Sequence, residues 1–144
     1  MAVVAKSGVP SPSTLEWPAS CQIGSGLICG EDLDEGDACF IKQSDGKVYK
    51  SGGSGVTALT DEGANIHGFA AEKCLSAQAD AVTLLTDLTW RYGASLTAGD
   101  KVYLDVSAAT KGRLNDAIGV AGLPPAGIII DATRIRLFMA ITLT

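Results

Sequence analysis

The sequence is poor in the residues that build catalytic and metal sites. It has one histidine, His67, in 144 residues, and aromatic residues make up only 6%. Its four cysteines form no Cys-x-x-Cys pair and His67 is not close to them in sequence, so we expect no zinc site. No apolar run approaches the roughly 20 residues of a membrane-spanning helix.

Positive charge is also scarce. The chain has 11 Lys and Arg against 16 Asp and Glu, a formal net charge of −5. Nucleic-acid binding needs a basic stripe that displaces counterions from phosphates, and an anionic membrane likewise attracts basic segments. We therefore expect neither nucleic acid nor membrane as a partner.

The cysteines lie at positions 21, 29, 39 and 74. Their even number permits disulfides, but the first residues lack the basic segment and apolar core of a secretory signal. We therefore expect reduced, buried cysteines in a protein made in a cytoplasm.

The abundant residues favour β-structure. With 47% hydrophobic residues and 17 glycines, the chain should fold as one domain rich in turns and strands. Leu96–Leu104 combines a Gly-Asp turn with an alternating strand, and Leu33–Ile41 has leucine, Gly-Asp, an aromatic and an aliphatic residue at the same offsets. This similarity predicts an internal duplication.

Later segments repeat in the same order. Each copy continues into a hairpin tip, Asp45–Val48 or Lys111–Leu114, and then a Gly-apolar run at Gly68 or Gly127. We therefore divide a β domain, residues 26–144, into repeats of about 30–93 and 94–144. The fold class predicted is all-β: a small barrel or sandwich of two divergent β units, with an extended N-terminal arm and at most one short helix.

Three further segments carry specific expectations. Ala70–Ala79 is the only plausible helix. Ala126–Asp131 is almost continuously apolar, which predicts a strand covered on both faces. Arg134–Leu143 is the longest alternating stretch, which predicts a central strand whose core face is Ile135, Leu137, Met139, Ile141 and Leu143.

Residues 1–25 differ from the rest of the chain. Prolines 10, 12 and 18 exclude a helix and favour an extended arm separable from the β domain. The arm also carries apolar residues, and we name Val3, Val4, Val9 and Trp17 as candidate partner-binding residues. Two alternatives are open: the arm folds back on its own domain, or it lies on another subunit.

A search for chemistry finds no convincing site. His67 would be a general base with Asp61 or Glu62 nearby, but an isolated structural histidine is the better interpretation. Neither glycine-rich loop, 24–26 or 52–55, has the Gly-Lys-Ser/Thr ending of a phosphate loop. The acidic segment 31–37 lacks the ligand spacing of a calcium loop. We expect no catalytic residues, no cofactor and no metal.

Several motifs nevertheless resemble a known family. Leu96–Leu104, Gly112–Ala117, Gly127-Ile128 and Asp131–Ile135 are similar to the C-terminal half of tailed-phage head decoration (cement) proteins, as are Ala81–Leu84 and Trp90–Tyr92. The resemblance covers about residues 70–143. Leu123–Pro125 and the proline-rich arm depart from the pattern.

The resemblance implies a structural protein rather than an enzyme. Such a protein is made in the host cytoplasm and binds the outer capsid surface of the virion. As a homotrimer it bridges subunits of the major capsid protein and stabilises the head against DNA pressure. The alternative is a carbohydrate- or receptor-binding β module of a tail or fibre, for which Trp17, Trp90, Tyr92 and Tyr103 are the candidate aromatic contacts. A small hydrolase is the third hypothesis.

Overall fold

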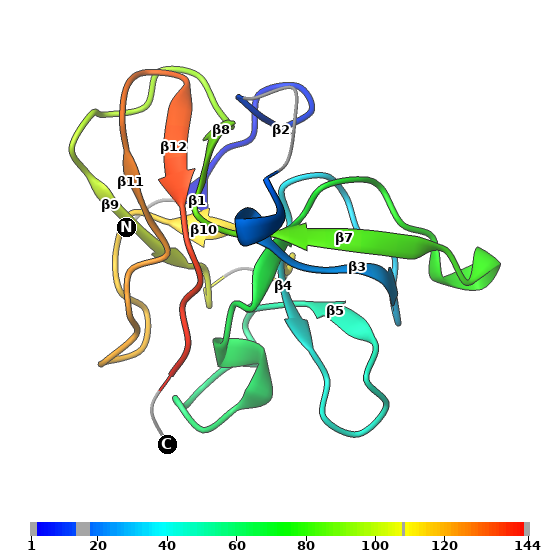
Figure 1. Cartoon of the computed structure of the whole chain (residues 1–144). Coiled ribbons are helices and arrows are strands. Elements are labelled where there is room, and N and C mark those ends of the chain that lie inside the picture. The colour runs from blue at the N-terminus through cyan, green and yellow to red at the C-terminus, as the bar shows by residue number, and fades with distance from the viewer. Residues whose placement is uncertain (1–2, 14–17, 108, 143–144) are drawn as a thin grey trace.

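The computed structural model describes residues 3–13, 18–107 and 109–142, which form two β-sheets and three short 3-10 turns (Figure 1). The strands are β1 Val3–Val4, β2 Ser11–Pro12, β3 Gln22–Ile28, β4 Ala38–Ile41, β5 Val48–Lys50, β6 Gly68–Ala70, β7 Ala81–Leu85, β8 Leu88–Arg91, β9 Lys101–Leu104, β10 Leu114–Asn115, β11 Gly127–Ile129 and β12 Arg134–Leu137. The 3-10 turns are η1 Ala19–Cys21, η2 Glu62–Ala64 and η3 Ser76–Gln78. These strands and turns confirm the all-β fold class.

The described part of the chain has no helix that is both long and apolar enough to cross a membrane.

The two sheets repeat one topology. The five-stranded sheet has the order β3-β7-β6-β4-β5, and the seven-stranded sheet contains the order β8-β12-β11-β9-β10. The strands β3 to β7, taken in sequence order, therefore occupy the same places in their sheet as β8 to β12 occupy in theirs. We call residues 22–85 (β3–β7) the first unit and residues 88–137 (β8–β12) the second unit. The bounds of these units differ from the repeats of about 30–93 and 94–144 that the sequence suggested, because β3 belongs to the first unit and β8 to the second.

The strand register repeats as well. Cys39 pairs with Gly68 in the first unit, and Val102 pairs with Gly127 in the second. These are the positions that the Leu33–Ile41 and Leu96–Leu104 similarity aligns. Glycine recurs there because a side chain would collide with the neighbouring strand: a Cβ on Gly127 would lie 2.5 Å from the Arg136 carbonyl oxygen.

The largest hydrophobic core lies between the units. Phe69 and Leu85 of the first unit are fully buried in the same cluster as Trp90 of the second, and the rings of Phe69 and Trp90 lie 6.4 Å apart. A separate cluster, which includes Val82 and Leu84, fills the interior of the first unit. One face of the first unit therefore packs against its own interior and the other packs against the second unit.

The two units are closed in different ways. In the first, a parallel bridge between Cys29 and Val48 brings the end of β3 to β5. In the second, the N-terminal segment spans the opening, because β1 pairs with β10 and β2 pairs with β8. We call residues 3–13 the strap. It adds a strand to each edge of the second unit, which accounts for the two extra strands of that sheet.

Two local predictions are wrong. Ala70–Ala79 is not a helix: β6 ends at Ala70, and the segment contains only the 3-10 turn η3. Its backbone is used elsewhere, since Cys74 exchanges both hydrogen bonds with Leu33. The cysteines are not all reduced, because Cys29 and Cys74 form a disulfide, while Cys21 and Cys39 are free. The pairing joins segments that are distant in sequence, so spacing alone did not reveal it.

The two C-terminal strand predictions are only partly right. β11 is covered on one face, because Ile128 is 44% exposed. β12 is central, between β11 and β8, but it ends at Leu137. The chain then leaves the sheet and pairs Ala140 with Ile66, so the burial pattern inverts. Ala140 and Thr142 are buried, Met139 and Ile141 are exposed, and Leu143 lies outside the described residues.

Candidate interaction surface

The strap is fixed to both units. The Lys6 ammonium forms an ion pair with Asp37 and donates a hydrogen bond to the Glu35 carbonyl oxygen at 3.0 Å. The side chains of Lys6 and Asp37 are only 9% and 3% exposed, so this pair is largely shielded from water. On the second unit, Ser7 donates a backbone hydrogen bond to the Tyr92 carbonyl oxygen. The strap therefore links the acidic turn of the first unit to the edges of the second.

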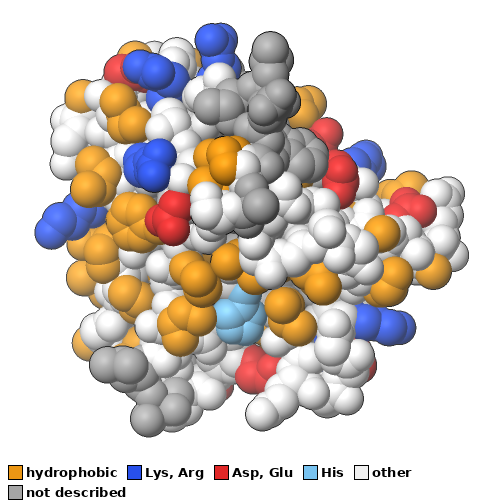
Figure 2. All heavy atoms as spheres, in the orientation of Figure 1, with side chains coloured by type: hydrophobic (Ala, Val, Ile, Leu, Met, Phe, Trp, Pro, Cys, Tyr) orange, Lys and Arg blue, Asp and Glu red, His pale blue; other side chains and the backbone are white. Residues whose placement is uncertain are grey.

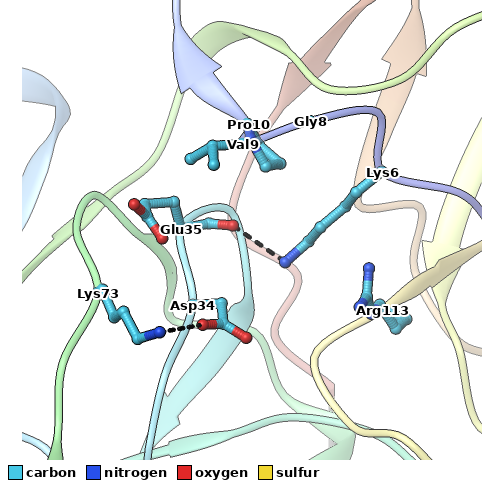
Figure 3. Close-up of a pocket in the computed structure, with 8 residues that line it drawn as sticks. All are labelled: Lys6, Gly8, Val9, Pro10, Asp34, Glu35, Lys73 and Arg113. Atoms are coloured by element: carbon cyan, nitrogen blue, oxygen red, sulfur yellow. Dashed lines mark hydrogen bonds and ion pairs between the residues drawn. The ribbon is translucent and has the colours of Figure 1, made fainter.

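A cavity of about 450 Å³ lies beneath the strap (Figure 3). Gly8, Val9 and Pro10 form its strap side, while Asp34, Glu35, Lys73 and Arg113 line it from the two units. Figure 3 shows Lys6 reaching across to Glu35, with the Arg113 guanidinium beside it. Lys73 and Asp34 lie together on one side of this cavity as an ion pair, and Lys6 and Arg113 lie on the other, so its lining carries both charges.

The structure separates the four partner-binding candidates. Val9 is 67% exposed and Val3 is 41% exposed, whereas Val4 is buried in the core between the units. Trp17 lies outside the described residues. Of the two alternatives for the arm, its described part folds back on its own domain, and the strap belongs to the second unit's sheet rather than forming a separate segment.

His67 has a structural contact. Its Nδ1 accepts a hydrogen bond from the backbone N–H of Ile41 at 2.8 Å. Partial burial lowers the pKa of His67, and the nearby Glu62 carboxylate partly opposes this shift. Asp61 and Glu62 accept hydrogen bonds from the backbone of neighbouring loops. The neutral imidazole of His67 therefore holds one end of β4 in place through this hydrogen bond.

Two of the segments considered as ligand loops, 52–55 and 31–37, make hydrogen bonds within the protein. The N–H groups of Gly52 and Gly53 donate to the carbonyl oxygens of Gly63 and Asp105. In the acidic segment, an Asp37 oxygen accepts the N–H of Asp34. Within residues 3–13, 18–107 and 109–142, no group of three or more potential ligand side chains could hold a metal ion.

The aromatic candidates for sugar binding are mostly inaccessible. Trp90 is 0% exposed and Tyr92 is 1% exposed, so neither ring can stack on a ligand. Tyr103 is half-buried, and Trp17 lies outside the described residues. An aromatic platform made from the described candidates is therefore absent.

One surface was not anticipated from the sequence. The side of the second unit's sheet that faces away from the core, which we call the outer face, carries Arg91, Lys101, Ile128, Arg134 and Arg136. Figure 2 shows Lys and Arg side chains among hydrophobic ones in the region where Figure 1 places β11 and β12. The alternation of Arg134 and Arg136 was a usable signal, but the apolar run around Ile128 suggested burial instead.

Comparison with known proteins gives no assignment. No protein family, curated protein or solved structure matches the chain.

Proposed function

We propose that this chain is a decoration (cement) protein that binds the outer capsid surface of a tailed phage. In this proposal it acts as a homotrimer, bridges subunits of the major capsid protein and stabilises the head against the pressure of packaged DNA. A protein that binds only the closed lattice stabilises it by mass action, and an oligomer multiplies weak contacts.

The strap carries this proposal. It fixes Val9 at 67% exposure on a loop whose two ends are held in the sheet by β1 and β2. Because its anchors are already ordered, burying Val9 on a partner costs little further conformational entropy. Pro10, buried against Gly36, restricts the loop further. This is a pre-organised apolar contact, suited to a fixed position on a lattice.

The cement motifs also occupy structurally coherent positions. Leu96–Leu104 supplies the turn and β9, Gly112–Ala117 contains β10, and Asp131–Ile135 leads into β12. Asp131 accepts hydrogen bonds from the backbone N–H groups of Thr133 and Arg134, which explains an Asp at the head of that strand. These three motifs therefore have structural roles within the second unit, as expected if the likeness is one of fold.

A direct test is co-sedimentation of the purified full chain with capsids assembled from the major capsid protein of a tailed phage whose genome encodes the chain. We expect binding to these capsids, none to a glycan resin, and a higher temperature of capsid rupture when the chain is bound. Val9→Asp should weaken binding at least about tenfold, whereas the matched control Ile118→Asp should bind normally. Ile118 is 45% exposed and lies outside the strap. Binding to glycans but not to capsids would overturn the proposal.

The carbohydrate-binding alternative has less support. It requires exposed aromatic rings, and the structure buries Trp90 and Tyr92. Glycan retention in the same assay is its test.

A further inference from the structure

The outer face of the second unit corresponds to a buried face of the first. In the first unit, Ala38 pairs with Phe69, and Phe69 pairs with Leu85; all three are 0% exposed because this row packs against the second unit. The first unit thus shows that this side of the repeated sheet is suited to packing on another unit.

The equivalent row in the second unit is open. Lys101 takes the position of Ala38, Ile128 that of Phe69, and Arg136 that of Leu85. An isoleucine that is 44% exposed therefore lies between two cations on paired strands. Within the described chain, neither Lys101 nor Arg136 forms an ion pair.

The flanking cations determine what can cover this face. A hydrophobic partner would have to bury Lys101 and Arg136 without counter-charges, at a high desolvation cost. An acidic partner instead gains charge complementarity, and contact with Ile128 adds apolar burial. The face is therefore suited to an acidic surface.

The chain carries such a surface itself. The first unit has ten acidic residues (Asp and Glu) and four basic residues (Lys and Arg), which give it a formal charge of −6. The second unit has four acidic and six basic residues, which give it a formal charge of +2. The densest acidic stretch is the segment containing Glu31, Asp32 and Asp34, of which Asp32 and Asp34 are exposed. Because the two units share one strand order and carry opposite charge, the second unit of one copy is suited to bind the first unit of the next copy, in a head-to-tail arrangement.

We propose that the outer face of the second unit binds the acidic segment Glu31–Asp34 in the first unit of a second copy. The contact is heterologous, so it can close into a ring of copies when the rotation between neighbours allows. This inference rests on the homotrimer of the proposed function, because it names the surfaces through which that trimer forms.

The first experiment measures self-association of the full chain by sedimentation velocity at low and high salt. We expect trimers at low salt that dissociate as salt is raised, because the contact is largely ionic. Lys101→Glu/Arg136→Glu should weaken self-association at least about tenfold. The control Lys47→Glu/Lys111→Glu makes the same change in net charge at two exposed cations away from the face, and should remain trimeric.

A charge swap makes the test specific. Glu31→Lys/Asp34→Lys should also dissociate the trimer, and combining it with Lys101→Glu/Arg136→Glu should restore association. Asp34 is suitable because its side chain makes only a 3.9 Å ion pair with exposed Lys73. Circular dichroism of each variant confirms folding. For a variant that does not fold, Lys101→Gln/Arg136→Gln provides the same comparison without charge reversal.

The outcomes separate this inference from the proposed function. A wild-type chain that stays monomeric, a face variant that remains trimeric, or a charge swap that fails to restore association overturns the inference. Capsid binding by the wild-type chain is scored separately, so the cement proposal stands or falls on co-sedimentation.

Discussion

The Lys6 ammonium and the Asp37 carboxylate form an ion pair 2.5 Å apart, with both side chains nearly excluded from solvent. The pair joins the strap to the turn that precedes β4. Lys6→Met should lower the free energy of unfolding by about 3 kcal/mol, because it leaves a buried carboxylate without its cation. Urea denaturation measures the change. The matched variant Lys73→Met removes an exposed 3.9 Å pair and should cost less than about 0.5 kcal/mol. Equal losses in the two variants would contradict the structure.

Stability should fall on acidification through the histidine range. The pKa of His67 is lowered, mainly by burial, so the unfolded chain binds a proton at higher pH than the folded chain does. The contribution of neutral His67 to the free energy of unfolding is therefore complete above the ordinary histidine pKa of about 6.5 and is lost as the pH falls below it. Protonation also removes the lone pair on Nδ1 that accepts the Ile41 N–H. The effect should stay below about 1 kcal/mol, since the ring is only half-buried.

His67→Ala should remove that pH dependence, as measured by urea denaturation at several pH values between about 5 and 7.5. Capsid binding should be unchanged. A folded His67→Ala chain that loses all function would instead support an enzyme.

Tyr92→Phe should not destabilise the protein. The hydroxyl group is buried without a hydrogen-bond partner among the described residues, and burial raises the pKa of Tyr92. Removing it should leave the free energy of unfolding unchanged or raise it by up to about 1 kcal/mol. Tyr49→Phe is the contrast, because the Tyr49 hydroxyl donates to Asp45 at 2.6 Å. Chemical denaturation should show a lower free energy of unfolding for Tyr49→Phe and no such decrease for Tyr92→Phe. A clear decrease for Tyr92→Phe would reveal a hydrogen-bond partner for that hydroxyl.

Reduction of the Cys29–Cys74 disulfide should destabilise the first unit. The bond closes a loop with a sequence separation of 45, for which chain entropy gives about 4 kcal/mol. Thermal unfolding with and without reductant should show the loss. Cys29→Ser/Cys74→Ser should reproduce it and be insensitive to reductant, while Cys21→Ser, which removes a free thiol, should remain sensitive.

Local patterns predicted much of this fold. The Gly-Asp turns, the hairpin tips and the alternation in β9 identified the repeated unit, because they reflect turn geometry and the two-residue period of a strand. The hairpin of β4 and β5, the antiparallel pairing of β9 with β10 and the central place of β12 were all predicted.

What sequence reasoning missed depends on contacts between distant segments. Ile128 belongs to an apolar run that resembles a doubly covered strand, yet its side chain is 44% exposed on the outer face. Met139 and Ile141 continue the β12 alternation, but the chain crosses to Ile66 and reverses which side is buried. The disulfide and the ion pair between Lys6 and Asp37 likewise join residues that only the tertiary fold brings together.

The strap also affects the order in which a newly made chain can fold. Val3 pairs with Asn115, so the start of the chain has no partner strand until most of the sequence has left the ribosome. The first unit has a hydrophobic cluster of its own and can collapse earlier, while the strap remains unpaired. The strap precedes both units in the sequence but must wait for strands of the second unit before it can pair. Until β10 emerges, Val4 has no partner strand, so its docking requires that synthesis has passed the middle of the second unit.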